Sequence, residues 1–463
     1  MLLIAAALFT ASMHSLGVVE VPVVPSGEHV AVTAAVAPVT VVPTVPTVPT
    51  VPNATVTVAP TGGQRTVDLD VLARARSRDF LADLTAVDLR DLERADTDAR
   101  VLATAQDHPP TAHDVTSWWA GLSSPTRERL TAVAPSVIGN LDGVPYAVRD
   151  RANRGTLRAG LADPGTDAAR AAMLGQVRTA LDEGPGEARR SLVVLDTRGA
   201  GRAAIAVGDL DTAADVTIVV PGMFYTVTGQ MHDLADTSAG LHGEQTAVAA
   251  LAGAHAGRGE AVLAWMGYRT PDMSNILSLD LARTGAARLE RVVDGIDAIR
   301  AEDPPRLNVV AHSYGSTTAL VALSSGRMHA DSLTVLGSPG SDVRSASELA
   351  VHPGQVYVGD AHSDPIAGSG YFGTDPGSPG FGSTVLDLSA ETVAATDGVF
   401  RRPVGHNDYL KPGTASLHDV ALIAVGRGDL VRDQTRHGQG GGRGPGTAPD
   451  VYLVRPQDLQ PRD

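Results

Sequence analysis

The stretch "VVAHSYGSTTAL" (residues 309–320) joins an apolar β-branched run to a helix-favouring segment, with Ser313 at the junction. Small residues, Ala311 and Gly315, lie two positions to either side of the serine. This is the spacing of a nucleophile elbow, with alanine where the pattern G-x-S-x-G has its first glycine. The tight turn needs small neighbours because backbones approach closely there. We therefore predict that Ser313 is a nucleophile, with an ordinary serine at a strand-to-helix turn as the alternative.

A nucleophile of this kind needs hydrogen-bond donors for the charge that develops on the substrate oxygen. The backbone N–H of Tyr314 stands at the expected helix start and is one candidate. The second candidate comes from "PGMFYTVTG" (221–229), where Gly222 permits a close backbone approach. We favour the N–H of Met223 over that of Phe224, and a purely structural turn is the alternative.

A serine hydroxyl also needs a base, which follows the nucleophile and the acid in chain order in this arrangement. His406 stands in a polar loop, "RRPVGHNDYL", close to the end of the sequence that can fold. We predict that His406 is the base, and a surface loop histidine is the alternative. The other histidines after Ser313 are His329, His352, His362, His418 and His437.

The orienting acid is sought in "VYVGDAHSDPIAG" (356–368), just after an apolar run. Asp364 is favoured because the Pro-Ile pair that follows it would hold the carboxylate still. Asp360 is the alternative. His362 precedes Asp364 by only two residues and is a poor candidate for the base.

Short apolar runs alternate with helical patterns after Ala188, which predicts an α/β fold with a doubly wound, mainly parallel sheet. A helix is expected over 279–303, and the first two runs suggest an antiparallel hairpin. The expected strands lie in 191–196, 203–209, 215–222, 260–268, 307–313, 332–340 and 355–360.

Leucine and valine at three- and four-residue spacing predict a helical N-terminal region over 66–187. Trp118 and Trp119 are expected in a core, with the sheet domain as the partner that buries these helices. Residues 21–65 carry a Pro-Thr-Val repeat that suits an extended linker. The sheet domain is expected over 188–425, followed by a glycine-rich tail over 426–463 that is too rich in glycine to order itself.

Composition excludes several classes of function. The net charge of −15 argues against a nucleic-acid partner. The chain has no cysteine, which excludes disulfides, thiolate catalysis and cysteine metal sites. The apolar run in residues 1–20 is similar to a signal-peptide core but lacks the basic residues before it. We expect an extracellular or cell-surface protein, with a cytoplasmic location as the alternative.

With these residues in place, the chain resembles an actinobacterial α/β-hydrolase family catalogued as a domain of unknown function. The resemblance covers roughly residues 110–425 and implies an α/β-hydrolase fold with Ser313, Asp364 and His406 at its triad positions. The chain departs from the family at Ala311 and in the sequence around His406. The resemblance rests jointly on "WWAGL", "IGNLDGVPYAVRDRAN", "VVPGM", "AWMGYRTP", "VVAHSYGS", "LGSPG" and "SDPIA".

The sequence therefore predicts a serine hydrolase that cleaves an ester or similar acyl bond of a small-molecule or lipid-like substrate, without metal or organic cofactor. An acyltransferase with the same triad, or a non-catalytic binding protein on a hydrolase scaffold, are the alternatives. In "AWMGYRTP" (264–271), Trp265, Tyr268 and Arg269 are candidates for substrate contact. A core position for Trp265 is equally open.

Overall fold

The computed structural model describes residues 67–434, apart from 253–257, 273, 277 and 394–397. The predicted apolar N-terminus, the Pro-Thr-Val linker and most of the glycine-rich tail lie outside the described residues. Within the described part, no helix is both long enough and apolar enough to cross a bilayer.

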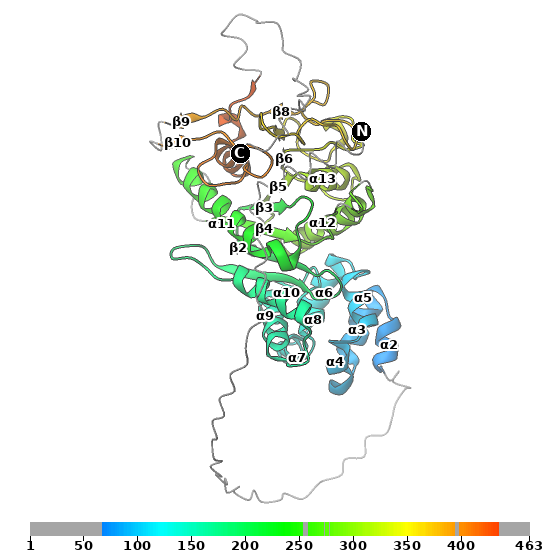
Figure 1. Ribbon diagram of the computed structural model, residues 1–463. Helices are drawn as coiled ribbons and strands as arrows, with labels where there is room; N and C mark the ends of the chain where they lie inside the picture. Colours follow the sequence, from blue (N-terminus) through cyan, green and yellow to red (C-terminus); the bar gives the residue numbers. More distant parts are fainter. Residues whose placement is uncertain (1–66, 253–257, 273, 277, 394–397, 435–463) are drawn as a thin grey trace, which may run out of the picture. The chain divides into compact units, whose positions relative to one another are not determined.

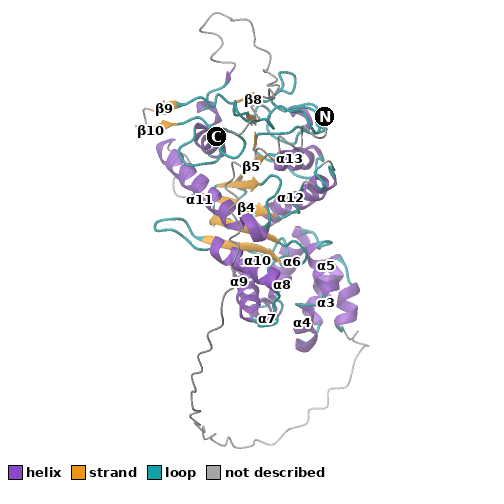
Figure 2. Cartoon of the chain, in the orientation of Figure 1, coloured by secondary structure: helices purple, strands orange, loops and turns teal. Residues whose placement is uncertain are grey.

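The centre of the fold is an eight-stranded sheet with the order β1-β2-β4-β3-β5-β6-β7-β8. Figure 2 shows the strands in orange, flanked by helices. The first two strands form an antiparallel hairpin, and β2 also runs antiparallel to β4. All remaining neighbours are parallel. The predicted hairpin and mainly parallel sheet are confirmed. The strands are β1 (Arg190–Asp196), β2 (Arg202–Gly208), β3 (Asp215–Val220), β4 (Glu260–Met266), β5 (Arg306–His312), β6 (Ser332–Leu336), β7 (Val356–Gly359) and β8 (Thr384–Val385).

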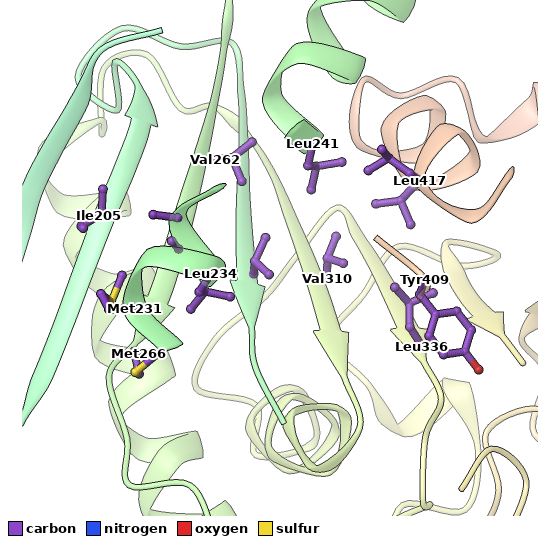
Figure 3. Packing of buried hydrophobic residues seen from close by; sticks show 14 of the residues in the cluster. Ile205, Met231, Leu234, Leu241, Val262, Met266, Val310, Leu336, Tyr409 and Leu417 are labelled. Atoms are coloured by element: carbon purple, nitrogen blue, oxygen red, sulfur yellow. The ribbon is translucent and has the colours of Figure 1, made fainter. Parts of the chain in front are cut away.

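Helices cover both faces of this sheet (Figure 1). The helices α11 (Val227–Ala252) and α14 (Ala415–Ala424) pack together on one face, and α12 (Asp280–Ile299) and α13 (Tyr314–Ser324) pack together on the other. Figure 3 shows Leu241 of α11, Leu417 of α14 and Val310 of β5 in the apolar layer of the first face. The smaller elements are the strands β9 (Glu391–Val393) and β10 (Gly398–Phe400) and the 3-10 turns η1 (Ala346–Glu348) and η2 (Gly428–Leu430).

The region before the sheet is helical, as predicted. Its first helices build a core of their own, which contains Trp119 at 5% exposure and the partly buried Trp118, whose Nε1–H donates to Thr85 Oγ1 at 2.9 Å. The predicted core position of the tryptophans is confirmed, but the apolar residues clustered with them come from the helical region itself. The helix that carries them, α6, also packs against α12 beside the sheet. The helices are α2 (Leu69–Arg74), α3 (Ser77–Ala86), α4 (Leu89–Ala95), α5 (Ala99–Gln106), α6 (Ala112–Gly121), α7 (Ser124–Val133), α8 (Pro135–Ile138), α9 (Tyr146–Ala162) and α10 (Ala168–Ala180).

The segment "IGNLDGVPYAVRDRAN" fastens these helices to the open edge of β1. The Asn140 side chain accepts from Leu195 N–H and donates to Leu195 O, both at 2.9 Å. Asp150 accepts from Leu192 N–H at 2.7 Å, and Asn153 donates to Leu192 O at 3.1 Å. An edge strand presents unpaired backbone groups, so these side chains satisfy them in place of another strand.

The fold continues beyond the boundary predicted at Val425. The 3-10 turn η2 follows, and Asp387 N–H donates to Arg432 O at 3.0 Å. Arg432 also donates to Ser389 O at 2.7 Å. Residues 426–434 are therefore part of the packed structure. The composition predicted no order here, but hydrogen bonds from the Arg432 side chain and backbone hold this segment in place.

Candidate active site

Ser313 occupies the turn between β5 and α13, with φ 55° and ψ −130°. A positive φ is unfavourable for a residue with a side chain and occurs where the surrounding structure enforces it. Here the crowding is direct, because a Cβ on Gly315 would lie 2.5 Å from Val220 O. The sharp turn therefore depends on the small residue two positions after Ser313, as the sequence predicted.

Three side chains far apart in the sequence meet at this turn. His406 Nε2 lies 2.8 Å from Ser313 Oγ, and His406 Nδ1 lies 2.9 Å from Asp364 Oδ2 and 3.0 Å from its Oδ1. Ser313, Asp364 and His406 are 2%, 7% and 9% exposed, so the chain of hydrogen bonds is shielded from bulk water. The structure thus brings together the three residues that the sequence singled out.

The Asp364 carboxylate is held by further donors. Tyr409 O–H donates to Oδ2 at 2.7 Å, and Ile366 N–H donates to Oδ1 at 2.8 Å. Burial alone would raise the pKa of Asp364, but the hydrogen bonds and the charge of His406, with the bonds from Tyr409 and Ile366, lower it below the usual value. Asp364 is therefore an ionised, fixed acceptor.

Tyr409 is a member of the site that the sequence did not reveal. It is 1% exposed, and its hydroxyl also accepts from Ala361 N–H at 2.8 Å. The hydroxyl therefore ties the loop that follows β7, which carries Asp364, to the loop that carries His406. The only signal in the sequence was its place three residues after His406, in "GHNDYL".

Asp360, the alternative acid, lies elsewhere in the same loop. Its side chain sits against Gly377, and its Oδ1 is buried without a hydrogen-bond partner among the described residues. Burial raises the pKa of Asp360 to about 7, and the charges of Asp375 and Asp364 add to the rise. The geometry therefore favours Asp364 over Asp360 as the partner of His406.

This raised pKa predicts a pH-dependent stability. Asp360 binds a proton in the folded protein up to pH of about 7, whereas the unfolded chain releases it near 3.8. The free energy of unfolding therefore falls as pH rises between these values. At pH 8 we expect the free energy of unfolding of Asp360→Asn to exceed that of the natural protein by about 1–3 kcal/mol, because the amide cannot ionise. At pH 4 the two free energies of unfolding should be nearly equal. Denaturant unfolding at both pH values measures this, and an equal effect at both would contradict it.

The predicted oxyanion donors flank the serine. A Cβ on Gly222 would lie 2.6 Å from Ser313 Cβ, so this glycine permits the loop after β3 to touch the serine. Phe224 N–H already donates to Pro271 O at 3.0 Å, whereas within the described part of the chain Met223 N–H has no acceptor. Tyr314 opens α13, where the first N–H groups have no partner within the helix. The geometry favours Met223 over Phe224.

His312, which immediately precedes the serine, is a second residue that the sequence left without a role. Its Nε2–H donates to His406 O at 2.6 Å, and the two rings lie 4.6 Å apart. Burial, with the neighbouring charge of His406, lowers the pKa of His312 to about 3. A neutral His312 therefore fixes the backbone that carries His406.

The predicted substrate contacts in "AWMGYRTP" are two buried rings and an exposed arginine. Trp265 and Tyr268 are 1% and 2% exposed and stack with ring centroids 5.6 Å apart. Tyr268 O–H donates to Pro221 O at 2.7 Å and so supports the loop that carries Gly222. Trp265 is a core residue, the alternative that the sequence left open. Arg269 is exposed and lies 3.7 Å from Asp272. Direct substrate contact is thus not supported for the two rings, because they are buried.

No group of three or more metal-ligating side chains capable of holding an ion occurs in the part of the chain that the structure describes.

A model of the α/β-hydrolase family matches residues 196–374, which include Ser313 and Asp364. The uncharacterized protein Mb0988c of Mycobacterium bovis is 32% identical over 223 residues, which cover 46% of this chain and 81% of that protein. The chain belongs to an actinobacterial family of α/β-hydrolases.

Longer relatives of this α/β-hydrolase occur in the same group of bacteria. The uncharacterized protein Rv2079 of Mycobacterium tuberculosis is 33% identical over 394 residues, which are 71% of this chain. The chain spans 58% of the length of that relative. Among solved structures, S-formylglutathione hydrolase from Agrobacterium tumefaciens is 11% identical with a TM-score of 0.33, covering 53% of this chain and 97% of its own.

The family match of this α/β-hydrolase ends before the histidine loop. The place of His406 is therefore given by its hydrogen bonds to Ser313 and Asp364.

Proposed function

We propose that the protein is a serine hydrolase that cleaves an ester or similar acyl bond through a covalent acyl-enzyme. The observation that carries the proposal is the unbroken line of hydrogen bonds from Asp364 through His406 to Ser313, with 2.9 Å and 2.8 Å separations. Nucleophile, base and orienting acid in this contact form the arrangement that activates a serine hydroxyl.

The roles follow from the atoms in contact. Ser313 Oγ attacks the substrate carbonyl carbon while His406 Nε2 takes the hydroxyl proton. Asp364 accepts from Nδ1–H, so it keeps the imidazole in the productive tautomer and stabilises the imidazolium. His406 then returns the proton to the leaving group, and the acyl group stays on Ser313 until water, deprotonated by the same histidine, releases it.

The backbone N–H groups of Met223 and Tyr314 would bind the oxyanion of the tetrahedral intermediate. Both are fixed by the fold before substrate arrives, and such preorganised donors stabilise a developing charge strongly. Gly222 supports this assignment because only a glycine lets the first donor loop lie against Ser313.

The burial of the serine favours a particular kind of substrate. Ser313 is only 2% exposed, so the part of the substrate that brings its carbonyl to the serine must be narrow. This favours small-molecule or lipid-like acyl esters over a folded protein loop. A panel of p-nitrophenyl esters from acetate to palmitate tests the proposal. Turnover that depends on acyl-chain length supports it, and absence of turnover across the panel together with no reaction with a fluorophosphonate would contradict it.

A further inference from the structure

A second hollow lies between the helical region and the sheet, apart from Ser313. This cavity of about 50 Å³ is formed where α5 and the segment after α8 meet β1, β2, β4 and α12, and the Trp265 ring forms part of its wall. No member of the Ser313–His406–Asp364 group lines it. The charged side chains in its lining are Asp142, Arg149, Asp196, Arg202, Arg288 and Arg291.

The carboxylates around the cavity are already shared among arginines. Asp107, at its rim, lies 3.0 Å from Arg198, 3.2 Å from Arg202 and 3.1 Å from Arg288. Asp196 also contacts both Arg198 and Arg202. The remaining pair is Asp142 with Arg149, at 2.8 Å. Five guanidinium groups therefore face three carboxylates when Arg291 is included, so positive charge is in excess.

Arg291 carries this excess most directly. Its NH1 donates to the backbone oxygen of Asp107 at 3.1 Å, but among the described residues no carboxylate lies within ion-pair distance of it. Burial lowers the pKa of Arg291, the charges of Asp142, Asp107 and Glu290 oppose this fall, and the charge of Arg202 adds to it. The guanidinium stays protonated throughout. A half-buried cation with no carboxylate in direct contact is costly, and an anion bound against it would offset that cost.

We propose that this cavity is a binding site for a small oxyanion, either free phosphate or the phosphate group of a larger molecule. Guanidinium groups suit the purpose because their paired N–H donors match the oxygens of phosphate. The volume of about 50 Å³ is far below that of pockets that enclose organic ligands, so only the anionic group itself fits inside.

Isothermal titration calorimetry of the full chain with inorganic phosphate tests the proposal. Sodium chloride at matched ionic strength serves as the reference. We expect saturable phosphate binding with one site per chain, and a melting temperature raised by about 2–5 °C at saturating phosphate. Arg291→Met should weaken phosphate binding at least about tenfold, the loss of one charge-assisted contact. Arg291→Lys, which keeps the charge but loses the fork, should give an intermediate affinity.

The matched control is Arg283→Met, since Arg283 lies on the same helix, is exposed and is 3.4 Å from Asp280. This variant should bind phosphate as the natural protein does. Glycerol phosphate distinguishes the two sources: tighter binding than inorganic phosphate assigns the site to a phosphorylated molecule, and weaker or equal binding assigns it to the free ion. No saturable binding by the natural protein, or an equal response to chloride, would overturn the proposal and leave the cluster a structural ion-pair network.

Discussion

Ser313→Ala is expected to lower kcat for an acyl ester by roughly 10⁶-fold, the loss seen when a triad nucleophile is removed. The Oγ is the atom that His406 Nε2 contacts at 2.8 Å, and the alanine methyl group cannot attack a carbonyl. The residue already adopts a positive φ, which alanine can occupy at a similar cost. Initial rates and the melting temperature of the variant measure the two effects separately.

Ser324→Ala is the matched control for this change. Ser324 lies at the exposed end of α13, the helix that Ser313 precedes, and its hydroxyl donates to Val321 O at 3.0 Å. We expect its kcat to match that of the natural protein. Activity in the Ser313 variant close to that of the control would mean that another group performs the attack.

Asp364→Asn is expected to lower kcat by roughly 10⁴-fold, as the loss of the orienting carboxylate does in serine proteases. The amide can donate to Nδ1 and so hold the imidazole in the wrong tautomer. It also removes the negative charge that stabilises the imidazolium. Tyr409 and Ile366, which now donate to the carboxylate, would lose a charged acceptor.

The comparison variant is Asp360→Asn, in the same loop and also a carboxylate-to-amide change. Since His406 contacts Asp364 and not Asp360, we expect the Asp360 variant to keep kcat within about threefold at pH 7. Steady-state rates of both variants on one ester decide the matter. A crippled Asp360 variant beside a mild Asp364 variant would exchange the two roles.

The architecture could be predicted from the sequence because each layer of the fold leaves its own periodicity. Strands such as β3 and β5 are short, largely buried and mostly apolar, and α12 carries a clear amphipathic pattern. The order of residues 426–434 could not be predicted in this way. This order depends on the contacts of Arg432 with the segment around Asp387. Amino-acid composition carries no information about such contacts between distant segments.

The site residues likewise fall into those that a local sequence pattern predicts and those that it does not. Ser313 could be identified from the sequence because the elbow needs small residues at fixed positions around the serine. Asp364 and His406 could be identified because the chain order of acid and base leaves few candidates after Ser313. Tyr409 and His312 act through hydrogen bonds to groups distant in sequence, so no local pattern marks them. The role of Trp265 could not be decided from the sequence, since an aromatic residue near a strand end fits a pocket and a core equally well until its burial is known.

The most direct test of the central claim is to locate the covalent adduct that a fluorophosphonate leaves on the natural protein. Proteolysis and mass spectrometry of the labelled full chain identify the modified peptide and residue. We expect one phosphonyl group per chain, on Ser313, and no labelling after prior unfolding. Stoichiometric modification of a different serine, or an unmodified Ser313 in a folded protein that still hydrolyses esters, would contradict it.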